Sequence, residues 1–116
     1  ALPPLIPFVK YLVSECHITN ATLLHAIVYT RRLHARLPQG ALAQPGSAHR
    51  IFVAALLLAN KYVEDTSSLT PQKLSNTLMH CMWWAFPEEI ARIERAFLKL
   101  MDFQLYVSDK DMTDFI

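Results

Sequence analysis

The sequence predicts an all-α domain. Its two glycines, Gly40 and Gly46, both fall in the proline-containing stretch 37–47. The rest of the chain therefore lacks the residue that hairpin turns and strand bulges use most often. The β-branched residues are scattered and do not alternate with polar residues over runs of strand length. Apolar residues instead recur at spacings of three and four, which is typical of helices packed around one core.

Length and composition restrict the class of protein. The 116 residues fit one domain spanning residues 1–116, and 53% hydrophobic against 18% charged residues excludes intrinsic disorder. A net charge of +1 argues against a nucleic-acid partner, which normally requires a basic excess. The longest apolar run, Ile51–Ala59, has nine residues, whereas a membrane span needs about 18–20, so we expect no membrane association.

The cysteines and the N-terminus indicate a cellular setting. Cys16 and Cys81 are too few for a disulfide framework, which favours a reducing compartment, the nucleus or the cytoplasm. The chain begins without Met and without a recognisable signal peptide. We therefore expect a piece of a longer protein.

The first two helices are expected on either side of a polar junction. The first spans about 4–16, where two prolines precede an apolar face. Thr19 or Asn20 can cap the second, which carries apolar residues at helical spacing and ends at the loop 37–47.

The third helix is expected to be the centre of the domain. Ser47 can cap it, and it should run from Ala48 to about Asp65. Its segment Ile51–Ala59 is apolar on every side, so it should be buried on every side. Lys61 follows this segment, and its ammonium must reach either water or a partner. A solvated lysine at a helix C-terminus is the simplest interpretation.

Two further helices follow. Thr70 can cap a fourth helix, with Pro71 at its first position, that ends near residue 80. The fifth opens at 86–89, where two acids sit at the positive end of the helix dipole. Its predicted inner face consists of Ile90, Ile93, Phe97, Leu98 and Met101. The tail, residues 108–116, begins another element.

Glu94 borders this inner face. One interpretation is a surface ion pair with a neighbouring cation of the same helix, worth about 0–1 kcal/mol. The other is that Glu94 meets Lys61 at the edge of an interface. Spacing alone does not choose between them.

Other polar clusters favour structural roles. The dipeptides Cys16-His17 and His80-Cys81 do not have zinc-ligand spacing, so no metal is expected. No nucleophile elbow, phosphate-binding glycine loop or acid/base dyad is present, so neither catalysis nor a cofactor is expected. Arg31, Arg32 and Arg36 are interpreted as a solvated helix face, with docking of a phosphate or an acidic segment as the alternative. The aromatic cluster around Trp83-Trp84 fits a core role better than an interface.

Three blocks of this sequence resemble a cyclin box. The blocks are 49–65 (HRIFVAALLLANKYVED), 90–107 (IARIERAFLKLMDFQLYV) and, upstream, 22–33 (TLLHAIVYTRRL). The His-Arg opening of the first block and Asp65 at its end are similar to the Pcl-type cyclins of fungi, including those of phosphate signalling and the cell cycle. A cyclin box is a five-helix domain around a buried third helix. This matches the five helices and the buried third helix that the sequence pattern predicts.

The resemblance implies a function and a site. A cyclin box binds a cyclin-dependent kinase and activates it by positioning the kinase's regulatory helix and activation loop. In the family, the lysine and glutamate at the positions of Lys61 and Glu94 contact the kinase backbone as a pair. Residues expected beside them are Phe52, Leu56, Tyr62, Asp65, Phe97 and Leu98. The resemblance thus implies a kinase partner and no small-molecule cofactor. The alternative is a cyclin-fold adaptor or scaffold in transcription that binds no kinase.

Overall fold

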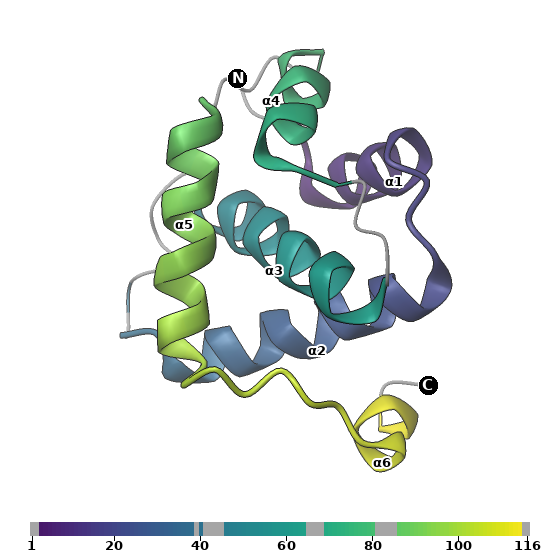
Figure 1. The fold of residues 1–116 in the computed structure, drawn as a ribbon, viewed down its shortest axis with the longest axis vertical. Helices are drawn as coiled ribbons and strands as arrows, with labels where there is room; N and C mark the ends of the chain where they lie inside the picture. The colour runs from purple at the N-terminus through teal and green to yellow at the C-terminus, as the bar shows by residue number, and fades with distance from the viewer. Residues whose placement is uncertain (1–2, 39, 41–45, 65–68, 81–85, 115–116) are drawn as a thin grey trace.

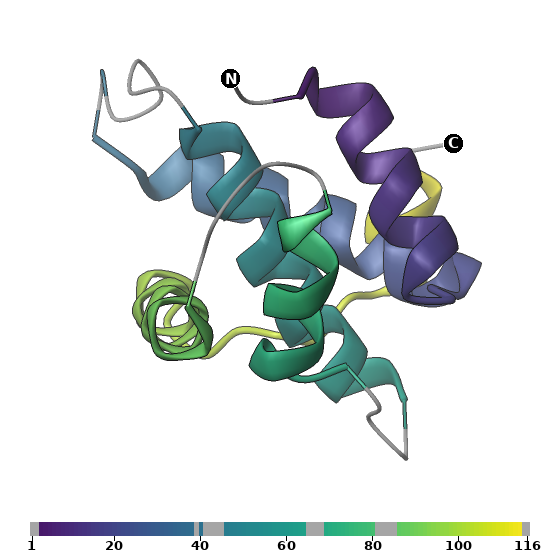
Figure 2. The same cartoon turned by 90° about the horizontal axis from the view of Figure 1, so that it is seen from above.

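The computed structural model describes residues 3–38, 40, 46–64, 69–80 and 86–114, and in these ranges it holds six helices and no strand. The helices are α1 (Leu5–Glu15), α2 (Asn20–Arg36), α3 (Ser47–Val63), α4 (Pro71–Met79), α5 (Pro87–Leu100) and α6 (Asp109–Thr113). Both views of the ribbon place α3 in the middle, with α1, α2, α4 and α5 around it (Figures 1 and 2). The all-α class and the central third helix are therefore confirmed.

Helix α3 forms the middle of the core. Every residue from Ile51 to Asn60 is buried, as the all-round apolar pattern predicts. Its most extensive packing is on α2, followed by α5 and α1. The predicted cap at Ser47 is wrong, because Gly46 is the N-cap residue and Ser47 already lies in the helix. Gly46 has a φ of 82°, which a glycine adopts without the steric cost that a side chain would bring.

The predicted caps of α2 and α4 are confirmed. Thr19 Oγ1 accepts a hydrogen bond from Thr22 N at 3.2 Å, and Thr70 Oγ1 accepts one from Lys73 N at 3.1 Å. Pro71 occupies the first turn of α4, where its missing N–H costs nothing. Local sequence chemistry therefore fixes where both helices begin.

The inner face of α5 differs from the prediction at one position. Ile90 and Met101 are buried, and Phe97 and Leu98 pack against the core. Ile93 is only half-buried, whereas Glu94, the next residue, is buried. The spacing 90, 94, 97, 101 follows the helical repeat more closely than a face that includes residue 93.

Beyond α5 the chain turns back across α2 towards α6 (Figure 1). Asp102 and Phe103 make this turn with φ values of 53° and 57°. Residues 104–108, called the strap below, then lead to α6, the further element that the tail predicts. Among the described helices, none is long and apolar enough to cross a bilayer. Asp65, Cys81, Trp83 and Trp84 lie outside the described residues.

Candidate functional site: the Lys61–Glu94 pair

The structure brings Lys61 and Glu94 together. Lys61 Nζ donates a hydrogen bond to Glu94 Oε1 at 3.0 Å and lies 2.9 Å from Oε2. Lys61 extends from the last turn of α3, and Glu94 lies in the middle of α5. Glu94 therefore pairs across two helices and not with a cation of its own helix.

The two partners differ sharply in exposure. The Glu94 side chain is 8% exposed, whereas the Lys61 side chain is 52% exposed. Although Oε2 is close to the ammonium, the directed hydrogen bond goes to Oε1. An ammonium has three N–H donors, so Lys61 keeps donor capacity for a group outside the domain. The buried carboxylate orients the lysine, and the lysine presents the charge at the surface.

A polar cluster fixes the end of α3 close to Lys61. The Glu64 carboxylate follows the last turn, and its Oε1 accepts from Thr19 Oγ1 at 3.0 Å and from Thr22 Oγ1 at 3.1 Å. An acid beside the N-terminus of α2 also complements the helix dipole. The contact ties the end of α3 to the start of α2. It therefore limits how far the turn that carries Lys61 can move.

The other predicted site residues divide by exposure. Tyr62 is 45% exposed, and its ring centroid lies 5.9 Å from that of His25 on α2. Phe97 and Leu98 are half-buried. Phe52 and Leu56 are 6% and 0% exposed, so they belong to the core and offer almost no surface to a partner. Asp65, as noted, is outside the described residues.

The exposure of Phe103, which follows the end of α5, was not expected from the sequence. Phe103 is 63% exposed, directly after the turn in which two consecutive non-glycine residues have positive φ. Such a backbone is strained and persists only where surrounding contacts hold it. The run of alternating apolar and polar residues after Met101 gave no signal for this turn.

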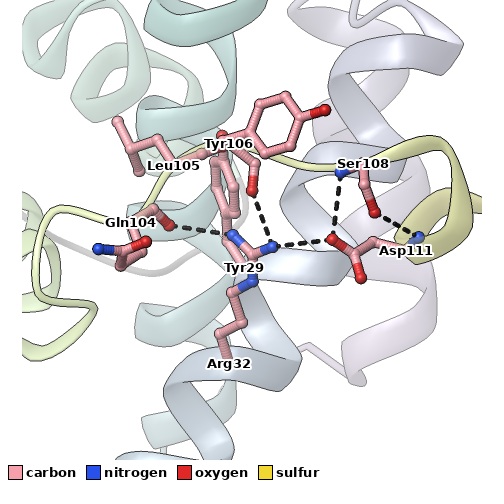
Figure 3. Close-up of polar contacts among 7 residues, drawn as sticks. All are labelled: Tyr29, Arg32, Gln104, Leu105, Tyr106, Ser108 and Asp111. Carbon is pink, nitrogen blue, oxygen red and sulfur yellow. Dashed lines mark hydrogen bonds and ion pairs between the residues drawn. The ribbon is translucent and has the colours of Figure 1, made fainter.

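The strap is held by side chains of α2 (Figure 3). Tyr29 donates its hydroxyl to the Leu105 carbonyl at 2.6 Å. Arg32 donates from Nη1 to the Gln104 carbonyl at 3.0 Å and from Nη2 to the Tyr106 carbonyl at 2.8 Å. Three consecutive carbonyls are therefore bound by two side chains. The interpretation of Arg32 as part of a solvated face is wrong, because its side chain is only 23% exposed.

Tyr29 makes a testable contribution to stability. Burial, and to a smaller extent the nearby Tyr62, raises the pKa of Tyr29, while Arg32 opposes the shift. The folded chain keeps this phenol neutral above about pH 10, where a tyrosine in the unfolded chain ionises. Its contribution is complete below that pH and is lost as the pH rises further. We expect Tyr29→Phe to lower the free energy of unfolding by about 1 kcal/mol at neutral pH.

Urea unfolding from pH 7 to pH 11 would check this prediction. The free energy of unfolding should fall more steeply with pH in the wild-type chain than in Tyr29→Phe. Tyr106→Phe is the matched control, because Tyr106 is 70% exposed. Parallel curves for the wild type and Tyr29→Phe would contradict the role of the buried phenol.

Of the two cysteine–histidine dipeptides, the structure describes Cys16-His17 and His80 but not Cys81. Cys16 is buried, and burial raises the pKa of its thiol. His17 is exposed. In the part of the chain that the structure describes, no three His, Cys, Asp or Glu side chains gather as metal ligands would.

The sequence is similar to known proteins over nearly its whole length. A family described as "Cyclin, N-terminal domain" matches residues 3–106. PHO85 cyclin-1, PHO85 cyclin-2 and PHO85 cyclin-9 of Saccharomyces cerevisiae are 33%, 27% and 25% identical, over 96%, 95% and 97% of this chain. The chain spans only 38%, 34% and 36% of the length of these relatives. No solved structure matches the chain significantly.

Proposed function

The chain belongs to the cyclin family, and we propose on that basis that it binds and activates a cyclin-dependent protein kinase. Cyclins are non-catalytic regulatory subunits, so the chemistry belongs to the kinase. The names of the relatives suggest a PHO85-like kinase as the partner. We further propose that this kinase regulation serves phosphate signalling or the cell cycle and takes place in the nucleus or the cytoplasm.

The observation that carries the proposal is the Lys61–Glu94 pair. A buried carboxylate that holds a half-exposed ammonium is a costly arrangement for stability alone, since an apolar pair of similar size often packs equally well. It is useful when the ammonium meets a partner. The remaining N–H donors of Lys61 suit main-chain carbonyls at the end of a kinase helix, where four such groups lack intrahelical partners.

The proposed contact surface extends from this pair along α3 and α5. Tyr62, Phe97 and Leu98 retain exposed apolar area, and we propose that they pack against the kinase around the Lys61–Glu94 pair. Asp65 follows the same end of α3 in sequence and is kept as a candidate. An apolar surface that surrounds a polar anchor excludes water from it, which strengthens the anchor's interaction.

Capture of a kinase from a fungal lysate tests the function. The immobilised 116-residue chain is compared with the Lys61→Ala/Glu94→Ala double variant, and bound proteins are identified by mass spectrometry. We expect the wild type to retain a cyclin-dependent kinase and the double variant to lose it. A purified candidate kinase should then phosphorylate a peptide substrate faster when the wild-type chain is added.

Arg92→Ala is the control variant, because Arg92 is an exposed cation on the same helix as Glu94. It should retain the kinase. If neither the wild type nor this control retains any kinase, the kinase proposal is wrong. The favoured function would then be that of a cyclin-fold adaptor or scaffold that binds no kinase.

A further inference from the structure

The Arg32 guanidinium binds more than the strap. Besides the two carbonyls, its Nη2 lies 3.3 Å from Asp111 Oδ2, which also accepts from Ser108 N at 3.1 Å (Figure 3). This carboxylate contact is longer than either carbonyl contact, and the Asp111 side chain is 42% exposed. The guanidinium therefore holds a main-chain segment firmly and an anionic group loosely.

An open concavity adjoins this anionic group. Its volume is about 550 Å³, and its walls are Arg32, Arg36, Asp102, Gln104, Tyr106 and Asp111. Arg36 is exposed and makes no hydrogen bond or ion pair with any residue in the described ranges. Tyr106 is 70% exposed and is one of the lining residues. Two guanidinium groups and an exposed tyrosine thus line a surface that the domain itself leaves partly unused.

We propose that this concavity binds a phosphorylated serine or threonine segment of a protein partner, and that Asp111 is an internal competitor for the same guanidinium. In the bound state, the phosphate oxygens accept from Arg32 and Arg36 together. The flanking residues of the partner lie along the strap and against Tyr106. The site shares no residue with the Lys61–Glu94 pair, so the proposal does not depend on kinase binding.

The presence of an intramolecular competitor favours a phosphate over a carboxylate as the external ligand. Asp111 is attached to the same chain, so its effective concentration at Arg32 is high, and a single external carboxylate would rarely displace it. Hydrogen bonding from Ser108, with the Arg32 charge as a smaller cause, lowers the pKa of Asp111, so the competitor is ionised at neutral pH. A phosphoserine carries close to two charges and three acceptor oxygens, which can engage both guanidinium groups at once.

The surrounding charges favour a protein segment over nucleic acid. Asp102 and Asp111 are part of the same walls, and Asp114 lines an adjoining hollow with Arg31 and Arg32. These acids would repel the successive phosphates of a nucleic-acid backbone. A single phosphate meets these acids only where Arg32 and Arg36 offset their charge, and its uncharged flanking residues meet no such repulsion.

Fluorescence anisotropy with a labelled peptide tests the site. The probe has seven residues, one phosphoserine flanked by glycine and alanine, and the comparison is the same peptide with serine. We expect the 116-residue chain to bind the phosphorylated probe at least about tenfold more tightly, the value of one charge-assisted hydrogen bond. Arg36→Ala should remove about that factor, because it deletes one phosphate ligand without touching the strap.

Two further variants distinguish specific binding at this concavity from general electrostatic attraction of the probe to the chain. Asp111→Asn should tighten binding, because the competitor loses its charge while the Ser108 turn can be kept. Arg92→Ala, which removes an exposed cation from α5, should leave binding unchanged. Equal binding of the two peptides, or an equal loss in Arg36→Ala and Arg92→Ala, would overturn the proposal. So would an Asp111→Asn variant that binds the probe more weakly than the wild type.

Discussion

Replacing Lys61 with alanine is expected to weaken kinase binding by about 2–5 kcal/mol, the range for a charged anchor that becomes desolvated in an interface. The physical reason is the asymmetry of the pair. The Lys61 side chain is half-exposed, whereas the Glu94 side chain is nearly buried. Loss of the lysine removes the donor to the kinase and also leaves a buried carboxylate without its cation. Stability should therefore fall as well, by about 1–3 kcal/mol, without unfolding the domain.

The comparison with Glu94→Gln identifies which residue makes the contact. The amide keeps the shape of Glu94 and an oxygen that can accept from Lys61, so Glu94→Gln should cost less affinity than Lys61→Ala. Calorimetric titration of the purified kinase, paired with urea unfolding of each variant, measures both effects. Arg92→Ala again serves as the control. Wild-type affinity in Lys61→Ala would refute the anchor assignment, and a larger loss in Glu94→Gln would assign the direct contact to the glutamate.

The central helix was predictable because its signal is local and continuous. Ile51–Ala59 leaves no polar face, so any compact fold must surround it. The starts of α2 and α4 were predictable for a similar reason, since a threonine cap acts within one turn. The start of α3 was predicted one residue late, because both a glycine and a serine were available and the backbone conformation decided between them.

The candidate site was only half predictable. Lys61 and Glu94 are separated by 33 positions, and no periodicity indicates that two helices bring them within hydrogen-bond distance. Their pairing was an open alternative until the packing of α3 on α5 was known. The face of α5 was also assigned too simply, because hydrophobicity placed Ile93 inwards while the helical repeat placed Glu94 there.

The role of Arg32 was not predictable at all. Its partners lie 72 to 79 positions later in the chain, two in the strap and one, Asp111, in α6. Because arginine side chains are usually exposed, the local sequence around Arg32 predicts a solvated side chain. Only the return of the chain across α2 turns that arginine into a clamp for main-chain carbonyls.

Leu56→Ala should separate a core role from a binding role within α3. Leu56 has no exposed surface, and α3 is packed against helices on several sides, so the structure cannot collapse easily into the space that the substitution leaves. We expect the free energy of unfolding to fall by about 3–5 kcal/mol, a large part of the 5–15 kcal/mol typical of a whole domain. The kinase affinity of the chains that remain folded should not change.

Leu100→Ala is the matched control for this substitution, because Leu100 has the same chemistry on α5 but is 38% exposed. Its free energy of unfolding should change by less than about 1 kcal/mol. Urea unfolding followed by circular dichroism gives the stabilities, and titration with kinase under native conditions gives the affinities. Equal losses of stability in the two variants would contradict the central position of α3. If Leu56→Ala lost affinity while its stability stayed unchanged, the Leu56 side chain would contact the kinase. In that case α3 would have to expose, on binding, a face that is buried in the free domain.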